Sequence, residues 1–124
     1  MKNNNLIIVG LGSIGANLAH YLLSRKYKVS VWDKDLFKLK NFSRKNKIKF
    51  KKKFSENTFK NSVVILTINA GKNVDKFFLK NLRSLKKVRY IIDLGNNHPD
   101  DTLQRYSYLK KNKITYINPG FSGG

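Results

Sequence analysis

Three glycines and one aspartate near the amino terminus have a spacing that points to chemistry. Gly10, Gly12 and Gly15 follow an apolar run and precede a helical pattern, and Asp33 comes about 20 residues later. Such a turn exposes backbone N–H groups to phosphate at the positive end of a helix dipole, and the acid can hydrogen-bond ribose hydroxyls. The spacing therefore predicts a dinucleotide site, and the alternative is a glycine turn that holds no ligand.

Alternating strands and helices are predicted to position these residues. Apolar and β-branched runs predict strands at 5–10, 27–33, 62–71, 88–95 and 114–118, with a further short strand around Ile48 and Phe50. Helical spacing predicts helices at 13–25, 35–44, 72–86 and from Pro99 onward. Parallel strands need such crossovers, so we expect one α/β domain over 1–124. Its fold would be Rossmann-like, a doubly wound, mainly parallel sheet with helices on both faces.

For several individual side chains, the sequence predicts a structural role and no role in binding or catalysis. We expect Ile14, Leu18 and Leu22 to form the apolar stripe of the first helix. His20 is interpreted as a surface residue and His98 as a loop residue. We expect Asp75 to be solvated or to cap a helix, and Trp32 and Tyr106 to be half-buried or in the core. Asp100 and Asp101 complement the dipole of the helix that they begin.

Several kinds of protein are not expected from the composition. The chain has no cysteine and only two histidines, so we expect neither a disulfide nor a metal site. No apolar run approaches the roughly 20 residues that span a bilayer, so we expect no membrane segment and a cytoplasmic location.

The formal net charge of +19 has two interpretations. Clustered lysines could bind nucleic acid through counterion release, with an affinity that depends strongly on salt. A general bias toward lysine, asparagine and isoleucine would produce the same charge without any partner. The lysines are spread over the chain and are dense only at 44–53, so we do not expect a nucleic-acid partner. A nucleotide or nucleic-acid binding protein without catalysis stays an alternative.

Motifs in the second half of the chain resemble the 6-phosphogluconate dehydrogenase family. They are ILTINAG, the run Asp93-Leu94-Gly95-Asn96, the pair Asp101-Thr102 and the final Ser122-Gly123-Gly124. The resemblance extends along essentially the whole chain. Other β-hydroxyacid dehydrogenases, such as the 3-hydroxyisobutyrate type, share the Ser-Gly-Gly ending and remain the alternative.

This resemblance implies two sets of binding residues. The implied contacts to a nicotinamide cofactor, NAD or NADP, are Gly10, Leu11, Gly12, Ser13, Ile14, Gly15, Asp33, Lys34, Asp35, Ile68, Asn69, Ala70 and Asn96. The implied contacts to a phosphorylated sugar acid are Asn96, Ser122, Gly123 and Gly124.

The residues after the second strand depart from the family pattern and concern the choice of cofactor. Members that use NADP have Asn-Arg-Ser or Asn-Arg-Thr where this chain has Asp33-Lys34-Asp35. A carboxylate at 33 repels the 2′-phosphate and favours NAD, whereas Lys34 could neutralise that phosphate. The sequence therefore leaves NAD and NADP open, with a preference for NAD.

The activity that the resemblance implies is oxidative decarboxylation of 6-phosphogluconate to ribulose 5-phosphate. In the family, the catalytic lysine and glutamate and the helical domain of the homodimer follow the Ser-Gly-Gly motif. We therefore expect no catalytic residue within these 124 positions and a chain that binds the cofactor without turning over substrate. Such a chain is either truncated or completed by a second polypeptide that supplies the missing domain.

Overall fold

The computed structural model describes residues 5–48, 50, 59–68, 72–95 and 98–119. Within these ranges, strands and helices alternate much as the sequence predicts. The strands are β1 (Asn5–Val9), β2 (Lys28–Trp32), β3 (Ser62–Leu66), β4 (Tyr90–Asp93) and β5 (Tyr116–Ile117). The helices are α1 (Ser13–Ser24), α2 (Leu36–Asn46), α4 (Lys72–Leu85) and α5 (Pro99–Lys111).

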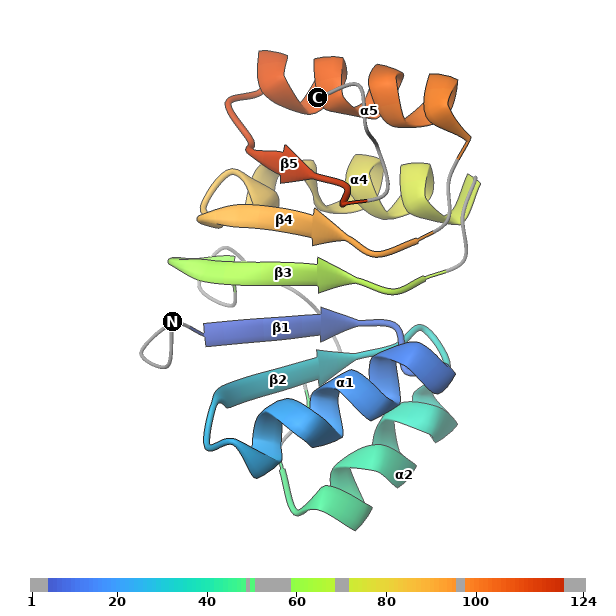
Figure 1. Cartoon of the computed structure of the whole chain (residues 1–124), viewed down its shortest axis with the longest axis vertical. Coiled ribbons are helices and arrows are strands. Elements are labelled where there is room, and N and C mark those ends of the chain that lie inside the picture. Colours follow the sequence, from blue (N-terminus) through green and yellow to red (C-terminus); the bar gives the residue numbers. More distant parts are fainter. Residues whose placement is uncertain (1–4, 49, 51–58, 69–71, 96–97, 120–124) are drawn as a thin grey trace.

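The five strands form one parallel sheet in the order β2-β1-β3-β4-β5. Figure 1 shows all the arrowheads at the same edge. Strand β1 lies at the centre of the reversal, because the chain first adds β2 on one side and then β3 on the other. At the carboxyl end of β1, Val9 lies opposite Trp32 of β2 and Leu66 of β3. In parallel sheets of this kind, ligands bind at such a reversal.

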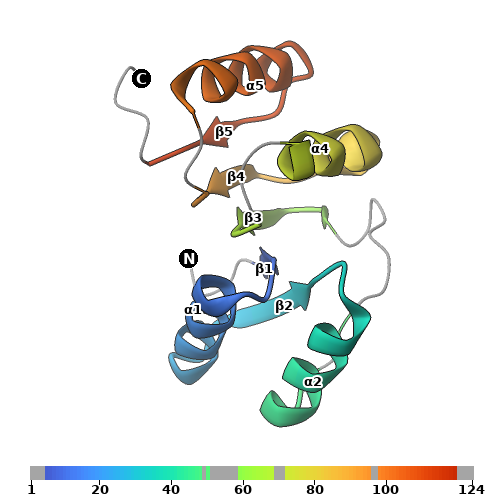
Figure 2. The same ribbon diagram turned by 90° about the vertical axis from the view of Figure 1, so that its right-hand side faces the viewer.

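Two apolar clusters cover the two faces of the sheet. Alternate residues of β1 divide between them, with Leu6 and Ile8 on one face and Ile7 and Val9 on the other. The first face packs against α1 and α2 and the second against α4 and α5. Figure 2 shows α1 and α4 on opposite sides of the sheet. The expected Rossmann-like, doubly wound fold is therefore confirmed.

The apolar stripe of α1 is rotated from its predicted position. Ile14 is 65% exposed, so its assignment to the buried stripe is wrong. The buried residues of α1 are Gly15 and Ala19, with Leu18 and Leu22 packed beside them. Successive helix positions are about 100° apart, and Gly15 faces the sheet, so Ile14 must point outward.

The predicted short strand around Ile48 and Phe50 is also wrong. Neither residue lies in a strand, although both side chains pack against the cluster under α1 and α2. Helix α2 ends with Lys47 in the left-handed region (φ 55°), and the Ile48 N–H donates to the Ser43 carbonyl at 3.0 Å. This backbone bond terminates the helix, so the Ile48 N–H is not available to a strand.

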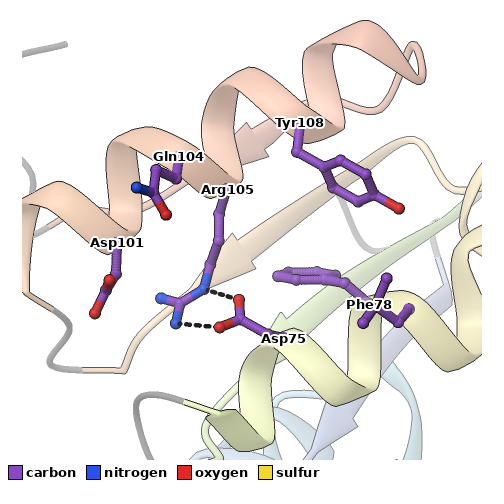
Figure 3. A pocket seen from close by; sticks show the side chains of 7 residues that line it. Asp75, Phe78, Asp101, Gln104, Arg105 and Tyr108 are labelled. Carbon is purple, nitrogen blue, oxygen red and sulfur yellow. Dashed lines mark hydrogen bonds and ion pairs between the residues drawn. The ribbon is translucent and has the colours of Figure 1, made fainter.

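An ion pair between a buried arginine and a half-exposed aspartate joins α4 to α5. The Arg105 Nε donates to the Asp75 carboxylate at 2.6 Å. Asp75 lies in the first turn of α4 and is 53% exposed, as a solvated residue would be, but the sequence did not predict its pairing with Arg105. Figure 3 shows the guanidinium pointing toward Asp75 in a groove between the helices. Burial lowers the pKa of Arg105, but the hydrogen bond and negative charge of Asp75 outweigh it, so the net shift is upward. The Arg105 side chain is 5% exposed and therefore needs this partner.

We expect Asp75→Asn to destabilise the chain, because it leaves a buried guanidinium without its counter-charge. The expected loss is roughly 2 kcal/mol of unfolding free energy, below the roughly 3–5 kcal/mol of fully buried pairs, since the Asp75 side chain is 53% exposed. Urea unfolding measures it. The matched control is Asp101→Asn, for which we expect a loss below about 1 kcal/mol from the helix dipole alone. Equal losses in the two variants would contradict this role of Asp75.

Candidate functional site

The glycine turn between β1 and α1 presents an open helix terminus. Gly10 has φ 107°, a conformation that side chains rarely adopt, and its N–H donates to the Trp32 carbonyl at 2.8 Å. Helix α1 begins after Gly12 with no side-chain cap and no acidic residue in its first turn. The first N–H groups of a helix have no acceptor within it. This terminus therefore offers uncapped donors and a positive dipole end to an anion.

The other two glycines of the turn serve different purposes. A Cβ on Gly15 would collide with the Gly10 carbonyl oxygen and with the Thr67 hydroxyl. A Cβ on Gly12 would meet no atom within 4 Å. Gly15 is therefore required for packing of α1 on the strand ends, whereas Gly12 leaves open space in front of the helix terminus.

Thr67 holds the turn from the neighbouring strand, and the sequence reasoning missed it. Its hydroxyl donates to the Gly10 carbonyl at 2.8 Å, and its N–H donates to the Val9 carbonyl at 2.8 Å. The available signal was its position as the first residue after β3, which parallel pairing places beside the first residue after β1. Ile68 follows it and is half-buried, with its side chain beside Gly10.

Asp33 connects the end of β2 to the glycine turn. Its Oδ2 accepts from the Leu11 N–H at 2.7 Å, and its Oδ1 accepts from the Asp35 N–H at 2.7 Å. The predicted acid and the glycine turn therefore lie together. Each carboxylate oxygen can accept a second hydrogen bond, so Asp33 retains capacity for ribose hydroxyls.

The next two residues point to different roles. Lys34 is exposed at the end of β2. The Asp35 Oδ1 accepts from the N–H groups of Phe37 at 3.0 Å and Lys38 at 3.3 Å, so Asp35 caps α2. A cap of this kind typically stabilises a helix by about 1 kcal/mol. Contacts of Lys34 and Asp35 with a cofactor stay predictions.

The carboxyl end of β4 contains a buried acid, Asp93. Asp93 is 0% exposed and accepts from the Gly95 N–H at 2.8 Å and from the Tyr116 hydroxyl at 2.5 Å. Burial of the phenol and its hydrogen bond to Asp93 raise the pKa of Tyr116 well above that of an ordinary tyrosine. His98 caps α5 by accepting from the Asp100 N–H at 3.2 Å, a more specific role than that of a loop residue.

The structure brings together the predicted residues of the glycine turn, Asp33 and Ile68 at one edge of the sheet. Six predicted contacts lie outside the described residues: Asn69, Ala70, Asn96, Ser122, Gly123 and Gly124. Within the ranges that the structure describes, no cluster of three metal-ligating side chains occurs and no helix is long and apolar enough to cross a membrane.

An uncapped helix terminus and an acid on the adjoining strand, at the point where the strand order reverses, define a dinucleotide-binding domain of the Rossmann type. A comparison with protein families identifies the family within this class. Residues 5–124 match the family model of the NAD binding domain of 6-phosphogluconate dehydrogenase, and the chain belongs to that family.

Curated relatives agree with this family. The chain is 31% identical over 130 residues to 6-phosphogluconate dehydrogenase, decarboxylating, of Buchnera aphidicola, with 100% of the chain covered. It is 30% identical over 128 residues to the NAD(+)-dependent enzyme of Bacillus subtilis, with 98% covered. The chain spans only 28% and 27% of the lengths of these two relatives.

Solved structures show the same fold. Plasmodium falciparum 6-phosphogluconate dehydrogenase, studied with NADP+ and with 6-phosphogluconate, superposes with a TM-score of 0.77 at 25% identity. That match covers 90% of this chain and 26% of the other. Mycobacterium tuberculosis 3-hydroxyisobutyrate dehydrogenase gives 0.78 at 15% identity, covering 93% of this chain and 39% of that one, which is a likeness of fold alone.

Alanine substitutions should separate the two glycines of the turn. We expect Gly15→Ala to lower the unfolding free energy by about 2 kcal/mol or more, because its Cβ collides with backbone. We expect Gly12→Ala to stay within about 0.5 kcal/mol of the parent chain, because its Cβ meets open space. Thermal and urea unfolding measure both. Equal destabilisation would contradict the division between packing and open space.

The raised pKa of Tyr116 predicts a loss of stability in alkali. Above about pH 10, the usual pKa of tyrosine, the unfolded chain releases a proton that folded Tyr116 retains, so the unfolding free energy falls as pH rises. Tyrosinate absorbance near pH 11 measures the ionised phenols of the native and the urea-unfolded chain. The native chain should contain fewer ionised tyrosines than the unfolded chain, and we expect this difference to be smaller by one in Tyr116→Phe. An unchanged deficit would contradict the assignment.

Proposed function

We propose that the chain binds NAD(H) at the carboxyl ends of β1, β2 and β3. The observation that carries this proposal is the uncapped start of α1, with open space in front of Gly12 and the Asp33 carboxylate beside it. The backbone N–H groups would hold the pyrophosphate, and Asp33 would accept from the adenosine ribose hydroxyls. The bound cofactor would supply a hydride acceptor.

Two carboxylates at the end of β2 support NAD over NADP. Asp33 is fixed by two backbone N–H groups, and Asp35 is fixed as the cap of α2. A 2′-phosphate next to them would meet two negative charges in defined positions and one flexible, exposed Lys34. The relative from Bacillus subtilis, named as NAD(+)-dependent, is consistent with this choice.

We also propose that this cofactor site serves oxidation of a phosphorylated sugar acid, namely oxidative decarboxylation of 6-phosphogluconate to ribulose 5-phosphate. The reaction converts the sugar acid and NAD+ into ribulose 5-phosphate, carbon dioxide and NADH. Support comes from the family and from the names of the relatives. From these 124 residues we expect binding without turnover, so formation of NADH from NAD+ and 6-phosphogluconate by this chain would contradict that expectation.

Titration of the purified chain with NADH and NADPH, followed by nicotinamide fluorescence, tests the proposal. Raised salt screens the +19 charge, which would otherwise favour the more anionic NADPH. We expect saturable binding that is at least about tenfold tighter for NADH. Repulsion between the 2′-phosphate and two carboxylates at short range can contribute the 1.4 kcal/mol that a tenfold difference requires. Gly12→Ala should lower the affinity for both NADH and NADPH without unfolding the chain.

Asp35→Ser is the matched variant for cofactor choice. Serine keeps the cap of α2 but removes the charge, so we expect the preference for NADH over NADPH to fall about threefold or more. A folded chain that binds neither cofactor would overturn the proposed function. A parent chain that prefers NADPH would overturn only the assignment to NAD, and a preference for NADH that is unchanged in Asp35→Ser would overturn only the contribution of Asp35 to it.

A further inference from the structure

The geometry of the proposed site places the second half of the dinucleotide over β3 and β4. Asp33 at the end of β2 would hold the adenosine ribose, and the terminus of α1 beyond β1 would hold the phosphates. The remaining half must then continue across the reversal of strand order, toward the ends of β3 and β4. The inference below rests on the proposed function.

At the end of β4, the Asp93 side chain holds the backbone of the residues that follow the strand. The Leu94 N–H donates to the Leu66 carbonyl at 2.9 Å, and the Gly95 N–H donates to the Asp93 carboxylate at 2.8 Å. Leu94 is 38% exposed at this edge. The backbone that presents Leu94 to a ligand is therefore held by the buried Asp93.

Tyr116 of β5 donates a further hydrogen bond to that carboxylate. Its hydroxyl lies 2.5 Å from the Asp93 Oδ2, and the residue is 4% exposed. Its ring packs edge-on against Phe78 of α4, with centroids 5.8 Å apart and an interplanar angle of 86°. Packing therefore fixes the phenol, so the donor approaches Asp93 from a fixed direction.

We propose that Tyr116 is a positioning residue for the nicotinamide half of the cofactor. Its hydroxyl holds the Asp93 carboxylate in the orientation that accepts from Gly95, and this bond keeps the backbone of Leu94 and Gly95 in place beneath the ligand. Without the hydroxyl, one oxygen of a fully buried carboxylate loses a donor. The carboxylate then reorients or admits water, and the Gly95 N–H loses its fixed acceptor.

The test compares a ligand that reaches this edge with one that does not. Calorimetry gives the dissociation constants of NADH and of ADP, which has the adenosine and both phosphates but no nicotinamide riboside. In Tyr116→Phe we expect affinity for NADH to fall about tenfold, or about 1.4 kcal/mol, with ADP unchanged within about twofold. The control Tyr106→Phe removes a hydroxyl from a 44% exposed residue on α5 and should change neither constant.

A second variant shows whether Tyr116 acts through the acid. Asp93→Asn keeps the size of the side chain but replaces one accepting oxygen by a donating NH₂ group. The asparagine therefore cannot accept from Tyr116 through one terminal atom and from Gly95 through the other. We expect Asp93→Asn to lower the affinity for NADH but not the affinity for ADP. The double variant should bind NADH no less tightly than the single variant with the lower affinity, because the two groups act as one unit. If Tyr116→Phe does not fold, the selectivity of Asp93→Asn alone decides.

The outcomes separate this inference from the proposed function. Equal weakening of NADH and ADP would show a merely structural role and overturn the inference, as would unchanged binding of NADH or additive effects in the double variant. In each of those cases the parent chain still binds NADH. A folded parent chain that binds neither ligand would overturn the proposed function, and the inference with it.

Discussion

The close approach of α1 to the end of β1 is the constraint on which the ligand edge depends. Gly15 lies against the Gly10 carbonyl at a separation that excludes any side chain, and this contact sets the direction in which α1 leaves the sheet. The same contact turns Ile14 outward, and the helix terminus is uncapped because its N-cap residue, Gly12, has no side chain. One backbone contact therefore decides both the packing of the first helix and the position of its free donors.

Side chains at the strand ends bind backbone groups along this edge. Thr67 after β3 and Asp33 after β2 bind backbone groups of the glycine turn, and Asp93 at the end of β4 binds its own following turn. Two of these three are charged groups that accept from neutral N–H donors, which are among the stronger hydrogen bonds in proteins. The described part of this edge is thus held by hydrogen bonds within the fold itself.

The order of the elements and the glycine turn could be predicted because they depend on local pattern. Apolar runs, glycines and the distant Asp33 are all visible along the chain. The bond from Thr67 to Gly10 and the pair of Asp75 with Arg105 could not, because they join residues 57 and 30 positions apart. Such contacts depend on how strands and helices pack, and helical periodicity alone also misplaced Ile14.

The aspartates and lysines of this chain are used very differently. Asp33, Asp75 and Asp93 bind specific partners across the fold, whereas every lysine whose exposure the structure describes is at the surface. Lysines can therefore accumulate or disappear over generations without disturbing the core, while loss of one of these acids would not be neutral. The large positive charge is a property of the surface that governs repulsion between molecules, and the described core does not depend on it.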